Sequence, residues 1–438
     1  MSKRSDSFKI REQMFAKRRC AMYENAPQRS IICIDMMSFY ASCIALLENL
    51  NVLEVPIAVI ANFNQKGSVV LAASPPMKKR FNIKTGSRLF EIPDHPDIRL
   101  FEPKMEFFIK MSMEITRLLN DFVPKEALHV YSVDETFVDL TGTEKLWGKP
   151  EETAKYIQSR IFDQFQIPSA VGMGPNMLMS KLALDLEGKK KGFAKWTYED
   201  IPTKLWPVRP LSEMWGIGRR TEKSLQNMGI FSVGDLAHAD LKMLEQRFGV
   251  MGNQLYYHAW GIDHSTIGAP ILQGQISYGK GQVLMRDYRN KNEILSVILE
   301  MCEDVARRAR EARTVGRTIS LGVGYSKDAF GGGFHRAHTI DFATNDTLKI
   351  YAVCKKLLNE FYDERPARSL SVTLSKIEPE YSMQLDLFDD RKLKNRQLGE
   401  VMDSIRTKYG STSLLRAVSY TNAGTALSRK GLLGGHKK

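Results

Sequence analysis

Cysteine is scarce in this chain of 438 residues, and the few cysteines present show no pattern. The five cysteines, an odd number, are scattered and include no Cys-x-x-Cys pair. This argues against a disulfide framework and indicates a reducing, intracellular setting. His335 and His338 have a chelating spacing, but no cysteine or third histidine stands near them, which argues against a zinc site.

Long apolar runs are also missing. No uninterrupted hydrophobic stretch is long enough to cross a bilayer. The charged segment from Lys3 to Arg19 lacks the apolar centre of a signal peptide. We therefore expect a soluble, cytoplasmic protein with no membrane partner.

Acidic residues are the minority charge. There are 63 Lys and Arg against 50 Asp and Glu, a formal net charge of +13, and no acidic residue follows Asp403. Hydrophobic residues make up 43%, which suits several folded domains at this length. The positive excess favours a polyanionic partner, nucleic acid before membrane, although many basic proteins bind neither.

Three carboxylates stand out because they adjoin buried-strand patterns. Asp35 ends the apolar run Ile31–Asp35, and the pair Asp134–Glu135 lies in Tyr-Ser-Val-Asp-Glu-Thr-Phe-Val-Asp-Leu. Charged groups are not normally left at such positions without a partner. Acids delivered by converging strands favour hard divalent cations, and a two-metal centre for phosphoryl transfer is one outcome. The alternative is that Asp134 and Glu135 only cap a hairpin turn.

The periodicity predicts a mixed α/β block from Arg29 to about Gly188. Its expected helices cover Lys104–Asp121, Glu151–Phe165 and Asn176–Leu186. The lysine run that follows is expected to be a solvated linker, or else an exposed surface face. Beside a DNA groove, Lys189 and Lys190 would bind phosphates nonspecifically.

A small helical stretch is expected from about Ile201 to His264. It contains a Gly-x-Gly turn that enters a helix, where free backbone N–H groups suit phosphate oxygens. Arg219, Arg220 and Lys223 add positive charge beside Gly216 and Gly218. This pattern is typical of a helix–hairpin–helix that grips the DNA backbone without reading sequence.

Residues of about 275–378 predict a β-α-β-β-α-β unit with helices at Lys291–Ala312 and Thr347–Tyr362. Arg286 and Arg336 fall near strand ends, where they could reach a duplex backbone or be ordinary surface charges. Beyond this unit, Gln384, Leu385, Leu387 and Phe388 suggest a docking peptide for a hydrophobic pocket, or else a short closing strand. A helix is expected at Leu393–Lys408, and a mobile tail after it.

Taken together, these segments resemble the Y-family translesion DNA polymerases, closest to the UmuC type, over about residues 29–420. The resemblance implies a right-hand fold with palm, fingers, helical thumb and a β-α-β-β-α-β little finger. The implied domains are a basic extension (1–28), palm (29–38 and 104–195), fingers (39–103), thumb (196–265), little finger (273–378) and a clamp-binding peptide with a tail (379–438).

The resemblance also implies residue roles. Asp35, Asp134 and Glu135 would hold two Mg²⁺ ions, or Mn²⁺, with the backbone carbonyl of Met36 completing one shell. Tyr40, with Phe39 packed beside it, matches the steric gate that excludes a 2′-OH. Lys181 matches the lysine that pairs with the triphosphate.

The fingers segment departs from the family pattern. Pro76 stands where many relatives carry a phosphate-contacting tyrosine, and Lys79 where they carry arginine. Proline offers neither hydroxyl nor N–H, and lysine keeps the charge without a bidentate fork. Small residues at 72–74 would leave space over the nascent base pair, which suits a damaged template.

The implied activity is error-prone DNA synthesis from dNTPs on a primer–template, in an SOS-type DNA damage response, by a nucleoid-associated enzyme. The implied partners are the bacterial sliding clamp, through Gln384–Phe388, and for the tail a recombinase filament and an accessory subunit. Two rivals stay open: a two-metal nucleotide cyclase, and a clamp-tethered DNA-binding scaffold without catalysis. The cyclase does not need Tyr40 or a clamp peptide, and the scaffold does not need the three carboxylates.

Overall fold

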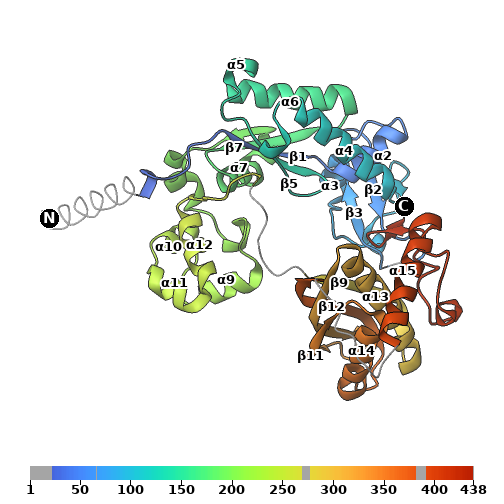
Figure 1. The fold of residues 1–438 in the computed structure, drawn as a ribbon. Helices are drawn as coiled ribbons and strands as arrows, with labels where there is room; N and C mark the ends of the chain where they lie inside the picture. Colours follow the sequence, from blue (N-terminus) through green and yellow to red (C-terminus); the bar gives the residue numbers. More distant parts are fainter. Residues whose placement is uncertain (1–21, 66, 269–276, 381–390, 438) are drawn as a thin grey trace, which may run out of the picture. The chain divides into compact units, whose positions relative to one another are not determined.

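A computed structural model describes residues 22–65, 67–268, 277–380 and 391–437, side chains of 391–393 excepted (Figure 1). Contacts divide the chain into two units, one up to Ala269 together with 436–438 and the other Pro270–Gly435. Within the described residues, no helix is both long and apolar enough to cross a membrane.

The central sheet of the first unit is built on β1, whose residues Ile31–Ile34 are fully buried. β1 pairs antiparallel with β6 on one side and β7 on the other, while β5 and β8 form the edges. The strand predicted at Ile31–Asp35 is confirmed. In sheet order, the strands are β5 (Leu128–Val130), β6 (Glu135–Asp139), β1 (Ile31–Met36), β7 (Ser169–Gly174) and β8 (Phe193–Lys195).

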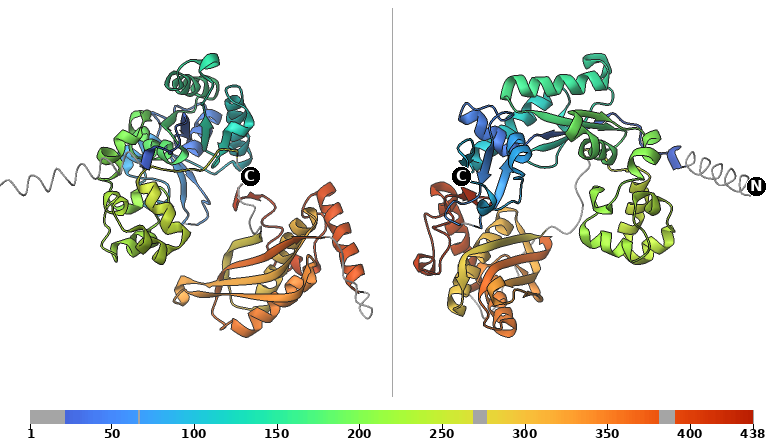
Figure 2. Two further views of the ribbon diagram at one scale, coloured as in Figure 1. Left: turned by 60° about the vertical axis from the view of Figure 1, so that its left-hand side comes forward. Right: turned by 180° about the vertical axis from the view of Figure 1, so that it is seen from behind.

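Helices cover both faces of this sheet (Figures 1 and 2). α4 (Met105–Asn120) and α6 (Pro150–Phe165) lie on one face, with the short α5 (Glu144–Trp147) before α6, and α7 (Met177–Ala183) lies on the other. α7 approaches β7 very closely, because a Cβ atom on Gly172 would lie 2.1 Å from the backbone oxygen of Ser180. Glycine at this position therefore lets helix and sheet meet.

The prediction of a solvated linker at the lysine run is wrong. The helical path continues from α7 through the π-helix Leu184–Gly188 into α8 (Lys189–Lys191), and β8 follows as a strand of the central sheet. Carboxylates one turn earlier compensate the lysines, because Lys191 pairs with Glu187 at 2.7 Å and Lys189 with Asp185 at 2.9 Å. The run is therefore a helix end attached to the sheet.

A second, three-stranded sheet has the order β3-β2-β4, with β3 (Val70–Ala73), β2 (Ile57–Ile60) and β4 (Arg99–Phe101). α2 (Phe39–Leu47) connects it to β1, and α3 (Pro75–Phe81) follows β3. Met77 of α3 is fully buried against apolar residues of β2 and β3, which fixes α3 on this sheet. A 3₁₀ turn, Leu89–Glu91, precedes β4.

The expected helical stretch after β8 is confirmed. It begins with short turns at Tyr198–Asp200, Ile201–Leu205 and Leu211–Glu213, and continues with four α-helices. Trp260 is fully buried at its centre and donates its indole N–H to the Ala237 carbonyl at 2.9 Å. The helices are α9 (Arg219–Gln226), α10 (Val233–Ala237), α11 (Leu241–Phe248) and α12 (Val250–Ala259).

The second unit confirms the predicted β-α-β-β-α-β pattern. All its strand pairs are antiparallel, in the order β11-β10-β12-β9, and α13 and α14 pack together beside the sheet. Along the chain the elements are β9 (Tyr278–Tyr288), α13 (Lys291–Glu311), β10 (Thr314–Tyr325), β11 (Gly333–Thr344), α14 (Thr347–Phe361) and β12 (Ala367–Pro379).

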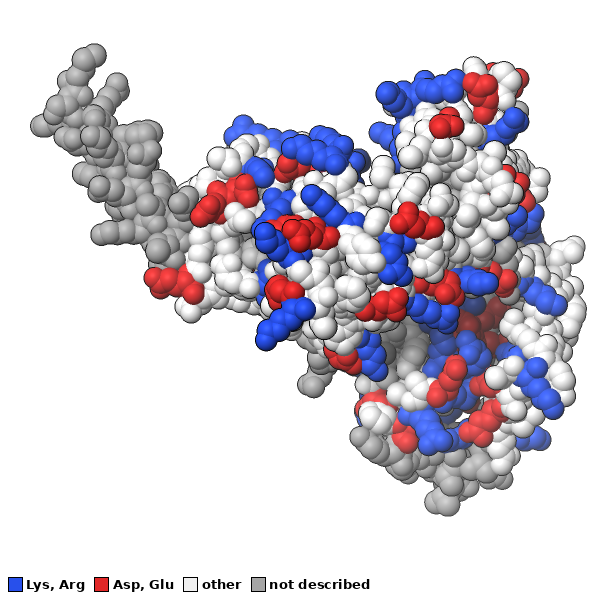
Figure 3. All heavy atoms as spheres, turned by 90° about the horizontal axis from the view of Figure 1, so that it is seen from above, with Lys and Arg blue, Asp and Glu red and all other residues white. Residues whose placement is uncertain are grey.

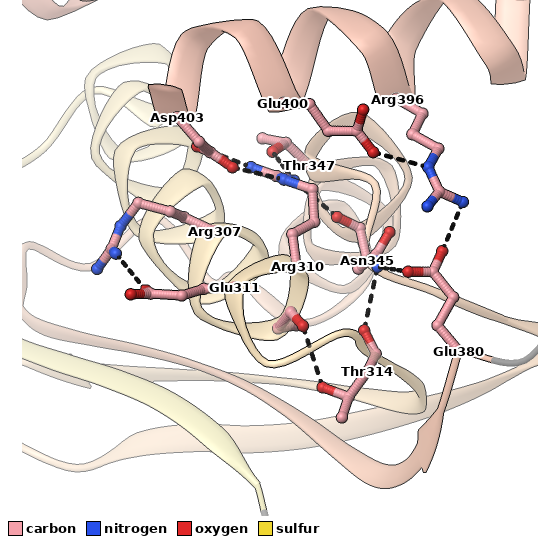
Figure 4. A network of polar contacts seen from close by, with 11 residues as sticks. Arg307, Arg310, Glu311, Thr314, Asn345, Thr347, Glu380, Arg396, Glu400 and Asp403 are labelled. Carbon is pink, nitrogen blue, oxygen red and sulfur yellow. Dashed lines mark hydrogen bonds and ion pairs between the residues drawn. The ribbon is translucent and has the colours of Figure 1, made fainter. Parts of the chain in front are cut away.

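Several ion pairs attach the C-terminal region to this unit. α15 (Arg391–Tyr409) is tied to α13 by Arg310 and Asp403 at 2.7 Å, within the polar network of Figure 4. Glu303 of α13 accepts from Arg406 at 3.0 Å and Arg416 at 2.7 Å. The tail was expected to be mobile after Lys408. Instead, residues beyond α15 dock on α13, with the Thr425 N–H and hydroxyl donating to Glu300.

Candidate active site

The strand register brings Asp35 and Glu135 together. β1 and β6 run antiparallel, and these two residues are direct partners across the ladder, at the end of β1 and the start of β6. Cross-strand partners point to the same face of a sheet, so both carboxylates lie on the face that α7 covers. The side chains of Asp35 and Glu135 are 15% and 12% exposed. Two half-buried acids therefore share one small volume.

A helical ladder of alternating charge faces this pair. Lys181, Asp185 and Lys189 follow one another at four-residue spacing along α7, the π-helix and α8. The Lys181 ammonium, 6% exposed, is hydrogen-bonded to Glu135 and lies 3.1 Å from Asp185. The Lys189 ammonium lies 3.0 Å from Asp35, 2.9 Å from Asp185 and 3.6 Å from Glu135. Three carboxylates and two ammonium groups thus form one network.

The surroundings of Asp35 disfavour the charged form of its carboxylate. Burial, and then the hydrogen bond with Glu135, raise the pKa of Asp35 to about 7, because Lys189 only partly opposes these effects. Burial would also raise the pKa of Glu135, but hydrogen bonds from Asp35 and Lys181 outweigh it and hold that pKa below its usual value. The site therefore still favours additional positive charge near Asp35.

Asp134 directly precedes β6 and has other hydrogen-bond partners. Its backbone carbonyl accepts the Met36 N–H at 2.8 Å, and its carboxylate accepts from the Ser132 hydroxyl at 2.5 Å. Among the described residues, no three His, Cys, Asp or Glu side chains are arranged as a ready-made metal site. The structure thus brings Asp35 and Glu135 together and keeps the Asp134 carboxylate on Ser132. The acidic oxygen donors of Asp35 and Glu135, with a raised Asp35 pKa, nevertheless fit a hard dication.

Tyr40 and Phe39 open α2, directly after the turn that ends β1. The Tyr40 ring stacks on Phe108 of α4, with ring centroids 4.4 Å apart and planes 12° from parallel. Burial, and then the charge of Asp134, raise the pKa of Tyr40. Phe39 is 3% exposed and packs inward. The Tyr40 ring is therefore held rigidly close to the acidic residues, as a steric element requires.

The fingers helix α3 reaches the same turn through Lys78. Lys78 and Lys79 are both exposed, and the Lys78 ammonium donates to the Ser38 hydroxyl at 2.9 Å. Lys79 is the residue that stands where relatives carry arginine. Sequence reasoning missed Lys78 and Asp185, and it placed Lys189 in a nonspecific DNA contact. The four-residue spacing of Lys181, Asp185 and Lys189 is the signal that could have revealed one helical face.

The Gly-x-Gly turn enters α9 as expected. Gly216 has a φ of 92°, a conformation that favours glycine, and Gly218 is the N-cap residue with no side chain to satisfy the first N–H groups. Arg219, Arg220 and Lys223 are exposed around this end of α9. Free N–H donors and cationic side chains thus occupy one helix start, an arrangement that can hold phosphate oxygens.

The other predicted DNA contacts have different surroundings. Arg286 is paired with Glu293 at 2.6 Å and lies over the Tyr288 ring, whereas the Arg336 guanidinium lies 5.0 Å from the centre of the Phe361 ring. Lys190 is exposed. Figure 3 shows basic and acidic side chains interspersed over one face. The peptide at Gln384–Phe388 lies outside the described residues.

Three segments match family descriptions. Residues 34–185 match the impB/mucB/samB family, 275–387 match its C-terminal domain, and 198–230 match the HHH motif of the same family. The first match contains Asp35, Glu135 and Lys181, and the last contains the Gly-x-Gly turn.

Individual proteins match over nearly the full chain. UvrX of Bacillus subtilis, named for UV-damage repair, is 58% identical over 95% of this chain and 99% of its own length. DNA polymerase IV 2 of the same organism is 37% identical over 94% of this chain and 99% of its own. A solved Y-family DNA polymerase chimera, Dbh-Dpo4(243-245)-Dbh, covers 80% of this chain and 99% of its own at 20% identity, with a TM-score of 0.62, and so shares the fold.

Proposed function

This chain belongs to the impB/mucB/samB family of UmuC-type Y-family DNA polymerases, and we propose that the network around Asp35 and Glu135 is its catalytic centre. The chain is a DNA-directed DNA polymerase that acts in translesion synthesis during DNA damage tolerance, with primer–template DNA and dNTPs as substrates. The observation that carries the residue assignment is the pairing of Asp35 with Glu135 across β1 and β6.

Divalent cations are the cofactors of this family, and the residues present fit them. Asp35 and Glu135 would hold them, with the Met36 carbonyl, and Asp134 would join once its carboxylate leaves the Ser132 hydroxyl. When bound there, Mg²⁺ would supply a lowered pKa for an attacking 3′-OH and charge stabilisation for the departing pyrophosphate. We propose Mg²⁺ as the physiological ion, with Mn²⁺ as a substitute.

The two lysines of the network hold the acids in place before substrate arrives. Lys189 and Lys181 partly neutralise Asp35 and Glu135, which limits the repulsion between two half-buried carboxylates. With a dication held by the acids, the Lys181 ammonium would be available to pair with a phosphate oxygen. A flexible point charge suits a phosphate whose charge shifts during transfer.

The rigid Tyr40 ring selects the sugar. Its stacking on Phe108 restricts movement away from the nucleotide site, so a ribose 2′-OH over the ring would collide with it. The small side chains of Ala72, Ala73 and Ser74 would leave room above the nascent base pair for a damaged template base.

The proposed DNA-binding residues belong to other elements than the acidic network. The N-terminus of α9, with Gly216, Gly218, Arg219, Arg220 and Lys223, is proposed to bind phosphates of the duplex. Lys190, Arg286 and Arg336 are proposed as weaker backbone contacts. The sliding clamp is proposed as the partner of Gln384–Phe388, and a recombinase filament and an accessory subunit as partners of the tail.

Replacement of Asp134 by Asn together with Glu135 by Gln tests the assignment. These changes remove two charges but keep hydrogen-bonding groups for Ser132 and Lys181. We expect Mg²⁺-dependent primer extension on an abasic template to fall by about a thousandfold or more, because metal-held charge contributes several kcal/mol.

The matched control is Glu152→Gln, an exposed acid on α6, which should extend normally. DNA affinity, measured by fluorescence anisotropy, should be unchanged in both variants. Residual synthesis in the double variant near the wild-type rate would refute the assignment of these acids. If neither the variant nor the wild-type chain extends the primer in Mg²⁺ or Mn²⁺, the result would favour the non-catalytic scaffold.

A further inference from the structure

The position of the fingers helix α3 is fixed by its buried contacts. The Ser74 hydroxyl, fully buried at the N-cap, accepts from the Ile57 N–H and donates to the Val55 carbonyl, both at 2.8 Å. Pro75 and Pro76 occupy the first helical positions, where proline is favoured, and Met77 is fully buried below them. The direction in which residue 78 leaves the helix is therefore set by the core.

That direction leads to the turn between the acids and the Tyr40 ring. The Lys78 ammonium lies 2.9 Å from the Ser38 hydroxyl, and Ser38 stands two residues after Met36 and two before Tyr40. Ser38 is in the left-handed conformation, with φ 49°, which strains a residue other than glycine. Burial lowers the pKa of Lys78, Asp35 opposes this effect and Lys189 adds to it, so these charges act on one another.

The three ammonium groups of the site differ in their partners. Lys181 and Lys189 are each engaged by carboxylates, at 2.9–3.6 Å for Lys189. Lys78 contacts only a neutral hydroxyl in the described part of the chain, where it has no ion pair. A charge bound to a neutral partner is transferred to an anion at lower cost than one that must first leave a carboxylate.

We propose that Lys78 binds the triphosphate of the incoming deoxynucleotide and supplies the fingers contact that Pro76 lacks the groups to make. The inference rests on the proposed polymerase function and adds a substrate-binding residue to it. Successive helix residues are rotated by about 100°, so Lys79 leaves α3 in a different direction from Lys78. The helix thus directs one of these neighbouring lysines toward the Ser38 turn.

The test measures nucleotide binding separately from catalysis. The full-length chain is bound to a primer–template with a 3′-dideoxy terminus, and the Kd for the next correct dNTP is measured with Mg²⁺ by the fluorescence of a 2-aminopurine template base. For Lys78→Met we expect the Kd to rise by about tenfold or more, the usual effect of losing a charge-assisted contact. Lys78→Arg should restore much of the affinity.

Lys84→Met is the matched control, because Lys84 is exposed just beyond α3 and the same charge is removed. It should leave the Kd for dNTP unchanged, and DNA affinity without dNTP should be the same in all variants. A Kd for Lys78→Met equal to that of the wild type, or a rise only in Lys79→Met, would overturn the inference. Failure of the wild-type chain to extend a normal primer would instead refute the proposed function.

Discussion

At the scale of single residues, the site combines two neighbouring carboxylates with two lysines that partly neutralise them before any ligand binds. Asp35 and Glu135 face each other across the sheet, and burial above all raises the pKa of Asp35 to about 7 although Lys189 opposes it. Burial disfavours the ionised form of Asp35, and a dication beside it would favour that form. The chain keeps the acids close and leaves the last part of the neutralisation to its ligands.

Tyr40 gives the residue-scale prediction. Tyr40→Ala removes the ring that stacks on Phe108, so a ribose no longer meets a rigid surface. We expect the preference for dNTP over rNTP, measured as the ratio of kcat/KM values in single-nucleotide addition, to fall by about tenfold to a hundredfold.

Tyr40→Phe is the control, since it keeps the ring and removes only the hydroxyl. It should retain the sugar preference of the wild type. If Tyr40→Ala discriminates against ribonucleotides as strongly as the wild type, Tyr40 is not the gate.

At the scale of elements, burial decides the preferred protonation state of a histidine in α12. His258 lies in its last turn, where the helix dipole and Asp263 both favour the charged imidazole. Burial nevertheless lowers the pKa of His258, so desolvation is the larger effect. Burial at the end of this helix therefore favours the neutral form of His258.

This shift predicts a pH dependence of stability. The folded-state pKa of His258 lies below its unfolded value of 6.5, so protonation favours the unfolded chain as the pH falls below about 6.5. Between pH 7.5 and pH 5, we expect the melting temperature of the wild type to fall more than that of His258→Gln.

His264→Gln, at an exposed position outside α12, is the control and should follow the wild type. Equal losses of melting temperature in the wild type and in His258→Gln would show that His258 is not the titrating group.

At the scale of the whole molecule, the proposed catalytic centre and the proposed clamp-binding peptide lie in separate parts of the chain. The acidic network belongs to the first unit, whereas the proposed clamp peptide joins β12 to α15 in the second. The flanks of this peptide are linked, because Glu380 after β12 pairs with Arg396 of α15 at 2.7 Å (Figure 4). Changes to the peptide that keep its length should leave the chemistry intact.

We therefore expect Leu387→Ala with Phe388→Ala to weaken binding to the sliding clamp, measured by surface plasmon resonance, by about tenfold or more, since apolar anchors dominate such docking. Single-nucleotide addition without clamp should be unchanged, while the products made with clamp should shorten. Asp389→Ala with Asp390→Ala is the control of equal length. Clamp affinity that survives the loss of both apolar side chains would rule out the docking role.

The sequence by itself determined the strands, the helices and the family, because each rests on periodicity or on motifs that are local in the chain. It also identified Asp35, Glu135 and Lys181 as candidates, since each adjoins a recognisable element. The lysine run was misjudged because a solvated linker and a helix end have the same composition.

Only the tertiary structure decided which side chains share the site. The β1–β6 register pairs Asp35 with Glu135 across 100 residues of sequence, and Gly172 lets the helix with Lys181, Asp185 and Lys189 approach the sheet. The buried Ser74 and Met77 direct Lys78, rather than its neighbour, toward Ser38. Such proximities depend on register and close packing, which local sequence patterns do not encode.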